Sequence, residues 1–163
     1  MFIAKHSMLL KEVTKLLLGK KLTIAVAESC TGGLISHTLT NISGSSKYFK
    51  LGLVLYSNQA KSTILKISSK QIKRFGAVSE EIAVLMAKRV KKSAKAHIGI
   101  STTGIAGPSG GSKTKPVGTV FIGIAYKNHT SAKKFRFKGT RSEIKNQTKN
   151  KALLLVKQCL RNQ

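Results

Sequence analysis

The sequence of 163 residues contains no aspartate, and glutamate is its only acidic residue type. Ser-His-Asp triads, paired-aspartate hydrolases and Walker-type magnesium sites all need the missing residue, so these classes of site are excluded. The five glutamates are Glu12, Glu28, Glu80, Glu81 and Glu143.

Cysteine and long apolar runs are also scarce. The two cysteines, Cys30 and Cys159, are too few for a disulfide framework and are typical of a reducing cytosol. No apolar run approaches the ~18 residues needed to span a membrane. The segment Met1–Leu10 lacks the apolar stretch and cleavage site of a signal peptide. We therefore expect a cytoplasmic protein with no membrane partner.

Positive charge is abundant: 30 Lys and Arg residues give a net charge of +25, and only five of them are Arg. Such a charge attracts nucleic acids and phosphorylated ligands. The lysines are spread along the chain, however, and the bidentate Arg fork used in specific recognition is rare here. We expect at most non-specific binding of nucleic acid. The four scattered His residues and two distant Cys residues predict no metal site.

Hydrophobic periodicity predicts a single α/β domain over residues 1–163, with three α/β/α layers on a mixed sheet and an antiparallel edge hairpin. The expected helices are Ile3–Leu18, Leu34–Thr40, Asn58–Leu65, Glu80–Ser93 and Ser142–Leu160. The expected strands are Leu22–Ala27, Leu51–Tyr56, a strand from His97 to Ser101, Thr119–Tyr126 and Lys133–Lys138. At 41% hydrophobic, the chain can bury a core.

Two loops follow apolar strands, where open α/β sheets gather their ligands. The first, Glu28–Gly33, turns through two glycines into a helix and is either an anion site or a plain turn. The second, Thr102–Gly111, has four glycines in eight residues, which indicates either close approach of the backbone to a ligand or a flexible connection. Gly107–Gly111 matches G-x-S-x-G in form, but no strand leads directly into it.

A hydroxyl nucleophile with a lysine base needs neither a metal nor a pair of carboxylates. Lys61 lies on an expected helix just after an apolar strand, and burial together with neighbouring cations would lower its pKa. Spacing cannot identify the nucleophile, because Ser and Lys are so frequent that S-x-x-K pairs arise by chance. Ser29 and Ser46 both remain candidates from the residues alone.

Six motifs stand in an order that resembles the CinA C-terminal domain family, which includes the nicotinamide-nucleotide amidases. They are AESCTGG (27–33), SGSSKYF (43–49), YSNQAK (56–61), FGAVSEE (75–81), TGIAGPSGG (103–111) and KPVGTVFIG (115–123). The resemblance runs from about Leu9 to Leu160 and points to the stand-alone form of this domain.

The resemblance implies metal-independent hydrolysis of the carboxamide of nicotinamide mononucleotide, with no cofactor, in a homodimer. It implies Ser46 as nucleophile, Lys61 as general base and Tyr56 in proton transfer, with Arg141 pairing the substrate phosphate. The other substrate-binding residues it implies are Ser29, Thr31, Gly32, Thr103, Gly104 and Gly107.

The chain departs from the family pattern at three positions. Thr140 stands where the family usually has the Asp of G-D-R, Gln59 replaces a Glu, and Ser109 replaces a Gly. The competing interpretation is therefore a catalytically weakened module of this kind that binds nucleic acids or nucleotides.

Overall fold

The computed structural model describes residues 2–161, with side chains from residue 8 onward. Its centre is a five-stranded sheet in the order β2-β1-β3-β4-β5. The strands are β1 (Ile24–Glu28), β2 (Phe49–Val54), β3 (Ile98–Gly104), β4 (Thr119–Tyr126) and β5 (His129–Arg136). The first three are parallel, and β4 and β5 form an antiparallel hairpin at one edge. The predicted mixed sheet with an edge hairpin is confirmed.

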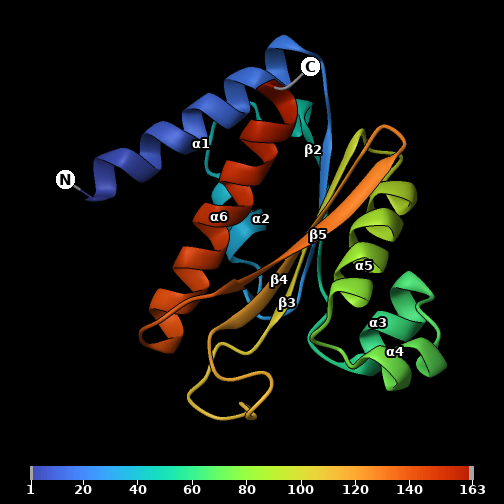
Figure 1. Cartoon of the computed structure of the whole chain (residues 1–163). Helices are drawn as coiled ribbons and strands as arrows, with labels where there is room; N and C mark the ends of the chain where they lie inside the picture. Colours follow the sequence, from blue (N-terminus) through green and yellow to red (C-terminus); the bar gives the residue numbers. More distant parts are fainter. Residues whose placement is uncertain (1, 162–163) are drawn as a thin grey trace.

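Helices cover both faces of this sheet, which confirms the three layers (Figure 1). One face carries α1 (Phe2–Gly19), α2 (Leu34–Thr40) and α6 (Arg141–Arg161). The other carries α3 (Asn58–Leu65), α4 (Ser69–Phe75) and α5 (Glu80–Ser93). A short 3₁₀ helix, η1 (Ser45–Lys47), precedes β2. No helix among residues 2–161 has the length and apolar character needed to cross a membrane.

Alternation along the central strands divides the buried residues between two cores. Ile24 and Val26 of β1 pack towards α1, α2 and α6, whereas Ala25 and Ala27 pack towards α5. Two glycines let α5 approach the sheet closely. A Cβ at Gly99 would lie 2.1 Å from the carbonyl oxygen of Ala87, and one at Gly123 would lie 2.4 Å from that of Ala83.

The structure adds one helix, α4, that the apolar pattern did not predict. Its first turn has a capping box: the Ser68 hydroxyl accepts from the Gln71 amide, and the Gln71 side chain accepts from the Ser68 amide. β5 begins at His129 rather than Lys133, because the whole segment pairs with β4 whatever its polarity. β2 ends at Val54, two residues before the predicted Tyr56.

The connections at the carboxyl ends of the parallel strands position the site. After β1 the chain turns to α2 on one face, and after β2 it turns to α3 on the other (Figure 1). Diverging connections of this kind leave a crevice outside the carboxyl edge of a sheet.

Candidate active site

A cavity of about 270 Å³ lies at this carboxyl edge. Segments that follow all three parallel strands line it, together with the start of α6. The lining residues are Ser29, Cys30, Tyr56, Asn58, Lys61, Ala77, Val78, Thr103, Gly104, Ile105, Ala106, Gly107, Ser109, Gly110 and Arg141. None of these described lining residues is acidic, and the guanidinium of Arg141 makes the cavity cationic.

Lys61 is buried at 2% exposure, an unusual position for a lysine. Its helix α3 is capped by the Ser57 hydroxyl, which accepts from the amide of Ala60 at 3.0 Å. Lys61 then lies on the inward face, one turn before the buried Leu65. Its Nζ donates to the carbonyl oxygen of Leu55 at 2.9 Å. The position of the lysine is therefore set by the helix cap, by packing and by this hydrogen bond.

Ser29 lies within reach of this lysine. Its amide donates to the carbonyl of Thr102 at 2.9 Å, which continues the ladder between β1 and β3 by one residue. Its hydroxyl oxygen is 3.2 Å from Lys61 Nζ. Burial lowers the pKa of Lys61, although the neighbouring Cys30 opposes this effect. A neutral amine at this position can accept the Ser29 proton, so the pair has the geometry of a nucleophile and its general base.

Cys30 also lines the cavity, but its thiol is a poor nucleophile. Burial raises the pKa of Cys30 to about 12. The thiolate is the reactive form of cysteine, so this side chain remains protonated and unreactive near neutral pH.

The first glycine loop already contains its own anion. The Glu28 carboxylate is fully buried and accepts the amides of Gly33 at 3.1 Å, Ile35 at 3.0 Å and Ser36 at 2.8 Å. It also accepts the Ser36 hydroxyl at 2.7 Å. These are the N–H groups at the start of α2 that a ligand phosphate would have used. Of the two interpretations of this loop, the structure therefore favours a structural turn, and Glu28 holds the segment that carries Ser29.

Arg141 closes the cavity from the first residue of α6. Its Nη1 donates to the carbonyl oxygen of Gly107 at 2.6 Å, and its Nη2 donates to the hydroxyl of Tyr56 at 2.5 Å. Tyr56 is nevertheless 62% exposed, so this wall faces solvent. A guanidinium in this position can bind an anionic group at the mouth of the cavity.

Thr140 stands where the family pattern usually has Asp, and it still fixes the helix start that carries Arg141. Thr140 donates its amide to the Glu143 carboxylate at 2.7 Å and its hydroxyl to the same oxygen at 2.9 Å. The Glu143 amide in turn donates to the Thr140 hydroxyl at 3.4 Å. This reciprocal cap fixes the start of α6. Threonine can therefore take the capping role that we expect of the family's usual aspartate.

The other predicted substrate-binding residues divide into two groups. Thr103, Gly104 and Gly107 line the cavity, and the Thr103 hydroxyl donates to the carbonyl of Ala77 at 2.7 Å. Thr31 and Gly32 do not line it. The buried hydroxyl oxygen of Thr31 lies 2.8 Å from the hydroxyl oxygen of Thr102, with which it shares a hydrogen bond. Gly32 forms part of a turn and has a φ of 61°.

Ser46 lies away from the cavity within the single chain. It belongs to the exposed helix η1, just before β2, whereas Lys61 follows the other end of that strand. Five residue steps of β2 separate the two ends by about 16 Å. One chain therefore does not bring Ser46 to Lys61, and the structure places Ser29 there instead.

Asn58, Ala77, Val78 and Ile105 line the cavity and are among the residues that sequence reasoning did not assign to the site. All four lie in the quoted motifs YSNQAK, FGAVSEE and TGIAGPSGG, so the motifs themselves were the available signal. Among the residues that the structure describes, no cluster of three His, Cys, Asp or Glu residues could hold a metal.

Comparison with known sequences identifies the family of the chain. The family description "CinA C-terminal domain" matches residues 6–160. A competence-damage inducible protein of Thermoanaerobacter sp. (strain X514) is 49% identical over 91% of the chain. One from Clostridium perfringens (strain 13 / Type A) is 50% identical over 83%. The chain spans only 36% and 33% of these relatives.

Solved structures agree with these sequence matches. A CinA superfamily protein from Klebsiella pneumoniae 700603 has a TM-score of 0.92 at 27% identity, over 97% of this chain and 98% of that one. The competence/damage inducible protein CihA from Agrobacterium tumefaciens has a TM-score of 0.91 at 36% identity, over 97% and 96%. The chain therefore belongs to the CinA C-terminal domain family.

Proposed function

We propose that the protein hydrolyses the carboxamide of nicotinamide mononucleotide, giving nicotinate mononucleotide and ammonia. The observation that carries the proposal is the buried contact of 3.2 Å between Lys61 Nζ and Ser29 Oγ, inside a cationic cavity. A serine and a lysine with a lowered pKa can perform acyl transfer without aspartate or metal.

In the proposed first step, neutral Lys61 takes the Ser29 proton and the Ser29 oxygen attacks the carboxamide carbon. The carbonyl π-bond electrons move to oxygen, and backbone amides of the cavity-lining segment Gly104–Gly107 donate to this oxyanion. The Ile105 amide is not one of them, because it donates to the carbonyl of Thr119 at 2.9 Å. Losing one such donor costs about 3 kcal/mol in other acyl-transfer enzymes.

In the second step, the tetrahedral intermediate collapses and the C–N bond breaks. Protonated Lys61 gives its proton to the departing amine, so ammonia leaves and an ester of Ser29 remains. Water then attacks the ester, with Lys61 again as base, and releases the carboxylate. Arg141, at the mouth of the cavity, pairs with the substrate phosphate.

Ammonia release from nicotinamide mononucleotide tests the proposal, with nicotinamide riboside as a matched substrate that lacks only the phosphate. We expect turnover of the nucleotide and a much higher KM for the riboside. A DNA titration at two salt concentrations, run in parallel, tests the competing interpretation. Selective DNA binding without any amide turnover would contradict the proposed function.

A further inference from the structure

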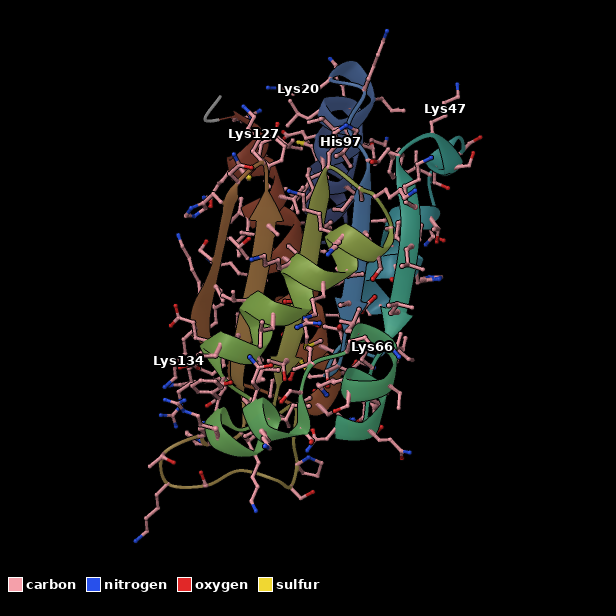
Figure 2. The ribbon with its side chains drawn as sticks, turned by 90° about the vertical axis from the view of Figure 1, so that its right-hand side faces the viewer. Lys20, Lys47, Lys66, His97, Lys127 and Lys134 are labelled. Carbon is pink, nitrogen blue, oxygen red and sulfur yellow. The ribbon has the colours of Figure 1, made fainter. Side chains whose placement is uncertain are left out.

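One edge of the sheet carries a dense group of cations. β5 and the two residues after it contain the segment KKFRFK (133–138), whose exposed cations are Lys133, Lys134, Arg136 and Lys138. In Figure 2 this edge runs down the left-hand side, with Lys127 near its upper end and Lys134 further down. Within the described part of the chain, the ion pairs join Glu12 to Lys157 and Arg161. No carboxylate therefore neutralises the four edge cations.

Alternate residues of this segment point to opposite faces of the sheet, which separates most of the cations from the aromatic rings. Lys134 pairs with Phe121 of β4 and lies on the same face, with its ammonium 5.9 Å from the centre of the Phe121 ring. Arg136 and Lys138 follow at intervals of two residues, and the amide of Phe137 continues the backbone ladder beyond β5. The three cations form a row about 13 Å long, which suits a polymer with regularly spaced negative charges.

The other face of the segment carries two phenylalanines. Phe135 and Phe137 are partly buried against the core that α1 and α6 cover, and their rings stack with centres 5.8 Å apart. The ammonium of Lys151, on α6, lies 5.2 Å from the centre of the Phe135 ring. Aromatic rings beside cations are typical of surfaces that bind single-stranded nucleic acids, because bases stack on the rings and phosphates pair with the cations.

A hollow of about 490 Å³ lies beside Phe137, lined by residues of α1 and α6. Met8, one of its apolar residues, is 61% exposed, and Lys151 and Lys157 supply its cations. Glu12, the acidic residue among the described lining residues, pairs with Lys157. The hollow shares none of its described lining residues with the candidate active site. It is therefore a separate site, of a size typical of pockets that hold small planar groups.

We propose that this edge binds single-stranded nucleic acid without regard to sequence. The phosphates pair with the exposed cations of residues 133–138, and a base enters the hollow and stacks on Phe137. Charges on an edge strand also keep other strands from pairing with it. That role alone needs no aromatic ring beside a hollow, whereas single-strand binding uses both features. The inference goes beyond the proposed function and is independent of it, because the two cavities are separate.

The salt dependence of binding tests the role of the edge cations. Fluorescence anisotropy of a labelled oligothymidylate of about 20 nucleotides measures affinity at several salt concentrations. The logarithm of the affinity of a single strand falls against that of the salt with a slope of about −0.7 per neutralised phosphate, so four cations predict a slope of about −3. Lys134→Gln combined with Lys138→Gln should bring the slope closer to zero by about 1.4.

A second double variant controls for the total charge. Lys70→Gln combined with Lys73→Gln removes two exposed lysines from α4, on the other side of the molecule from α6, and should change the slope little. Equal changes in the two double variants would overturn the proposal, because binding would then depend on the total charge and not on this edge.

Phe137→Leu tests base stacking, because it keeps an apolar side chain and removes the ring. The variant should bind the oligothymidylate at least about five-fold more weakly, with the salt slope unchanged. Binding of inorganic polyphosphate, which has the charge but no bases, should not change. Ammonia release from nicotinamide mononucleotide should also stay at the wild-type rate, since Phe137 lies outside the active-site cavity. Wild-type affinity of Phe137→Leu for the oligothymidylate would overturn the proposal.

Two other polyanions complete the test: a DNA duplex of the same length and vesicles that contain phosphatidylserine. Neither offers a free base, so each should bind alike to the wild-type protein and to Phe137→Leu. Vesicle binding without any binding of the single strand would overturn the proposal and indicate a membrane partner instead. If the wild-type protein releases no ammonia from nicotinamide mononucleotide, the proposed function fails, and the anisotropy measurement still decides the role of this edge.

Discussion

Arg141 and Tyr56, 85 residues apart in the chain, are joined by a hydrogen bond of 2.5 Å between the guanidinium and the phenol oxygen. The bond links the start of α6 to the segment after β2. The guanidinium also donates to Gly107 at 2.6 Å, so one side chain holds three parts of the cavity wall in place.

Replacing Arg141 by Gln should therefore raise the KM for nicotinamide mononucleotide by about ten- to one hundred-fold, because a charge-assisted contact with the phosphate is lost. The change in kcat should be smaller. Steady-state kinetics measure both constants. Arg136→Gln, which removes the same charge from the exposed edge strand β5, is the control and should leave KM unchanged. An unaltered KM in Arg141→Gln would show that the phosphate binds elsewhere.

Two serine variants decide which hydroxyl is the nucleophile. Ser29→Ala should lower kcat by about 10³-fold or more, because the attacking oxygen is removed while the fold is kept. Ser46→Ala should change kcat less than about three-fold, since Ser46 lies outside the cavity, at the end of β2 opposite to Lys61. The resemblance to the family led us to expect the reverse order. Rapid-quench detection of an acyl-enzyme, followed by peptide mapping, identifies the modified serine directly.

The pKa of Lys61 predicts how both activity and stability depend on pH. Burial lowers this pKa in the folded protein, so kcat/KM should rise with pH as the amine loses its proton. In the window between the lowered folded pKa and the usual lysine value, the unfolded chain binds more protons than the folded one. Stability in this window should therefore rise with pH.

Urea unfolding of the wild-type protein and of Lys61→Met at pH 7 and pH 9 measures this contribution. The wild-type protein should gain stability relative to Lys61→Met at the higher pH. Lys70→Met, at an exposed position on α4, is the control and should follow the wild-type profile. Parallel profiles for the wild-type protein and Lys61→Met would mean that Lys61 titrates alike in the folded and unfolded states.

Glu28 should be the glutamate whose loss costs the most stability. Glu28→Ala leaves three amides at the start of α2 and the Ser36 hydroxyl without their acceptor in a buried site. We expect the free energy of unfolding to fall by about 3 kcal/mol or more. Glu81→Ala, at an exposed position in the first turn of α5, should cost about 0.5 kcal/mol. Chemical denaturation gives both values, and equal losses would contradict the role assigned to Glu28.

Local patterns predicted most of the fold because they agree with its tertiary contacts. The buried strand β1 and the capped helix α5 are clear from apolar runs and from Ser79 with its following glutamates. α4 was missed because its signal is a capping box rather than an apolar stripe. The polar start of β5 was missed because its strand conformation depends on pairing with β4.

The site was predictable only in part, for a different reason. Sequence order places Lys61 and the two glycine loops after strands, so their convergence at one edge of the sheet follows from the topology. The choice between Ser29 and Ser46 depends on which end of β2 each residue occupies. The role of Glu28 depends on its side-chain carboxylate, which accepts backbone amides at the start of α2, among them that of Ile35, seven residues later in the chain. Neither arrangement produces a periodic pattern of residues in the sequence.

The positions of the glutamates have a consequence for acid conditions. Glu12 pairs with Lys157, Glu28 and Glu143 hold the starts of α2 and α6, and Glu80 and Glu81 lie in the first turn of α5. Neutralising all five carboxylates adds only five charges to the +25 of the chain. Each protonation instead removes a helix cap, a favourable helix-end charge or an ion pair. Acid should thus unfold this domain from its helix ends, through the loss of a few local bonds rather than through a large increase in repulsion.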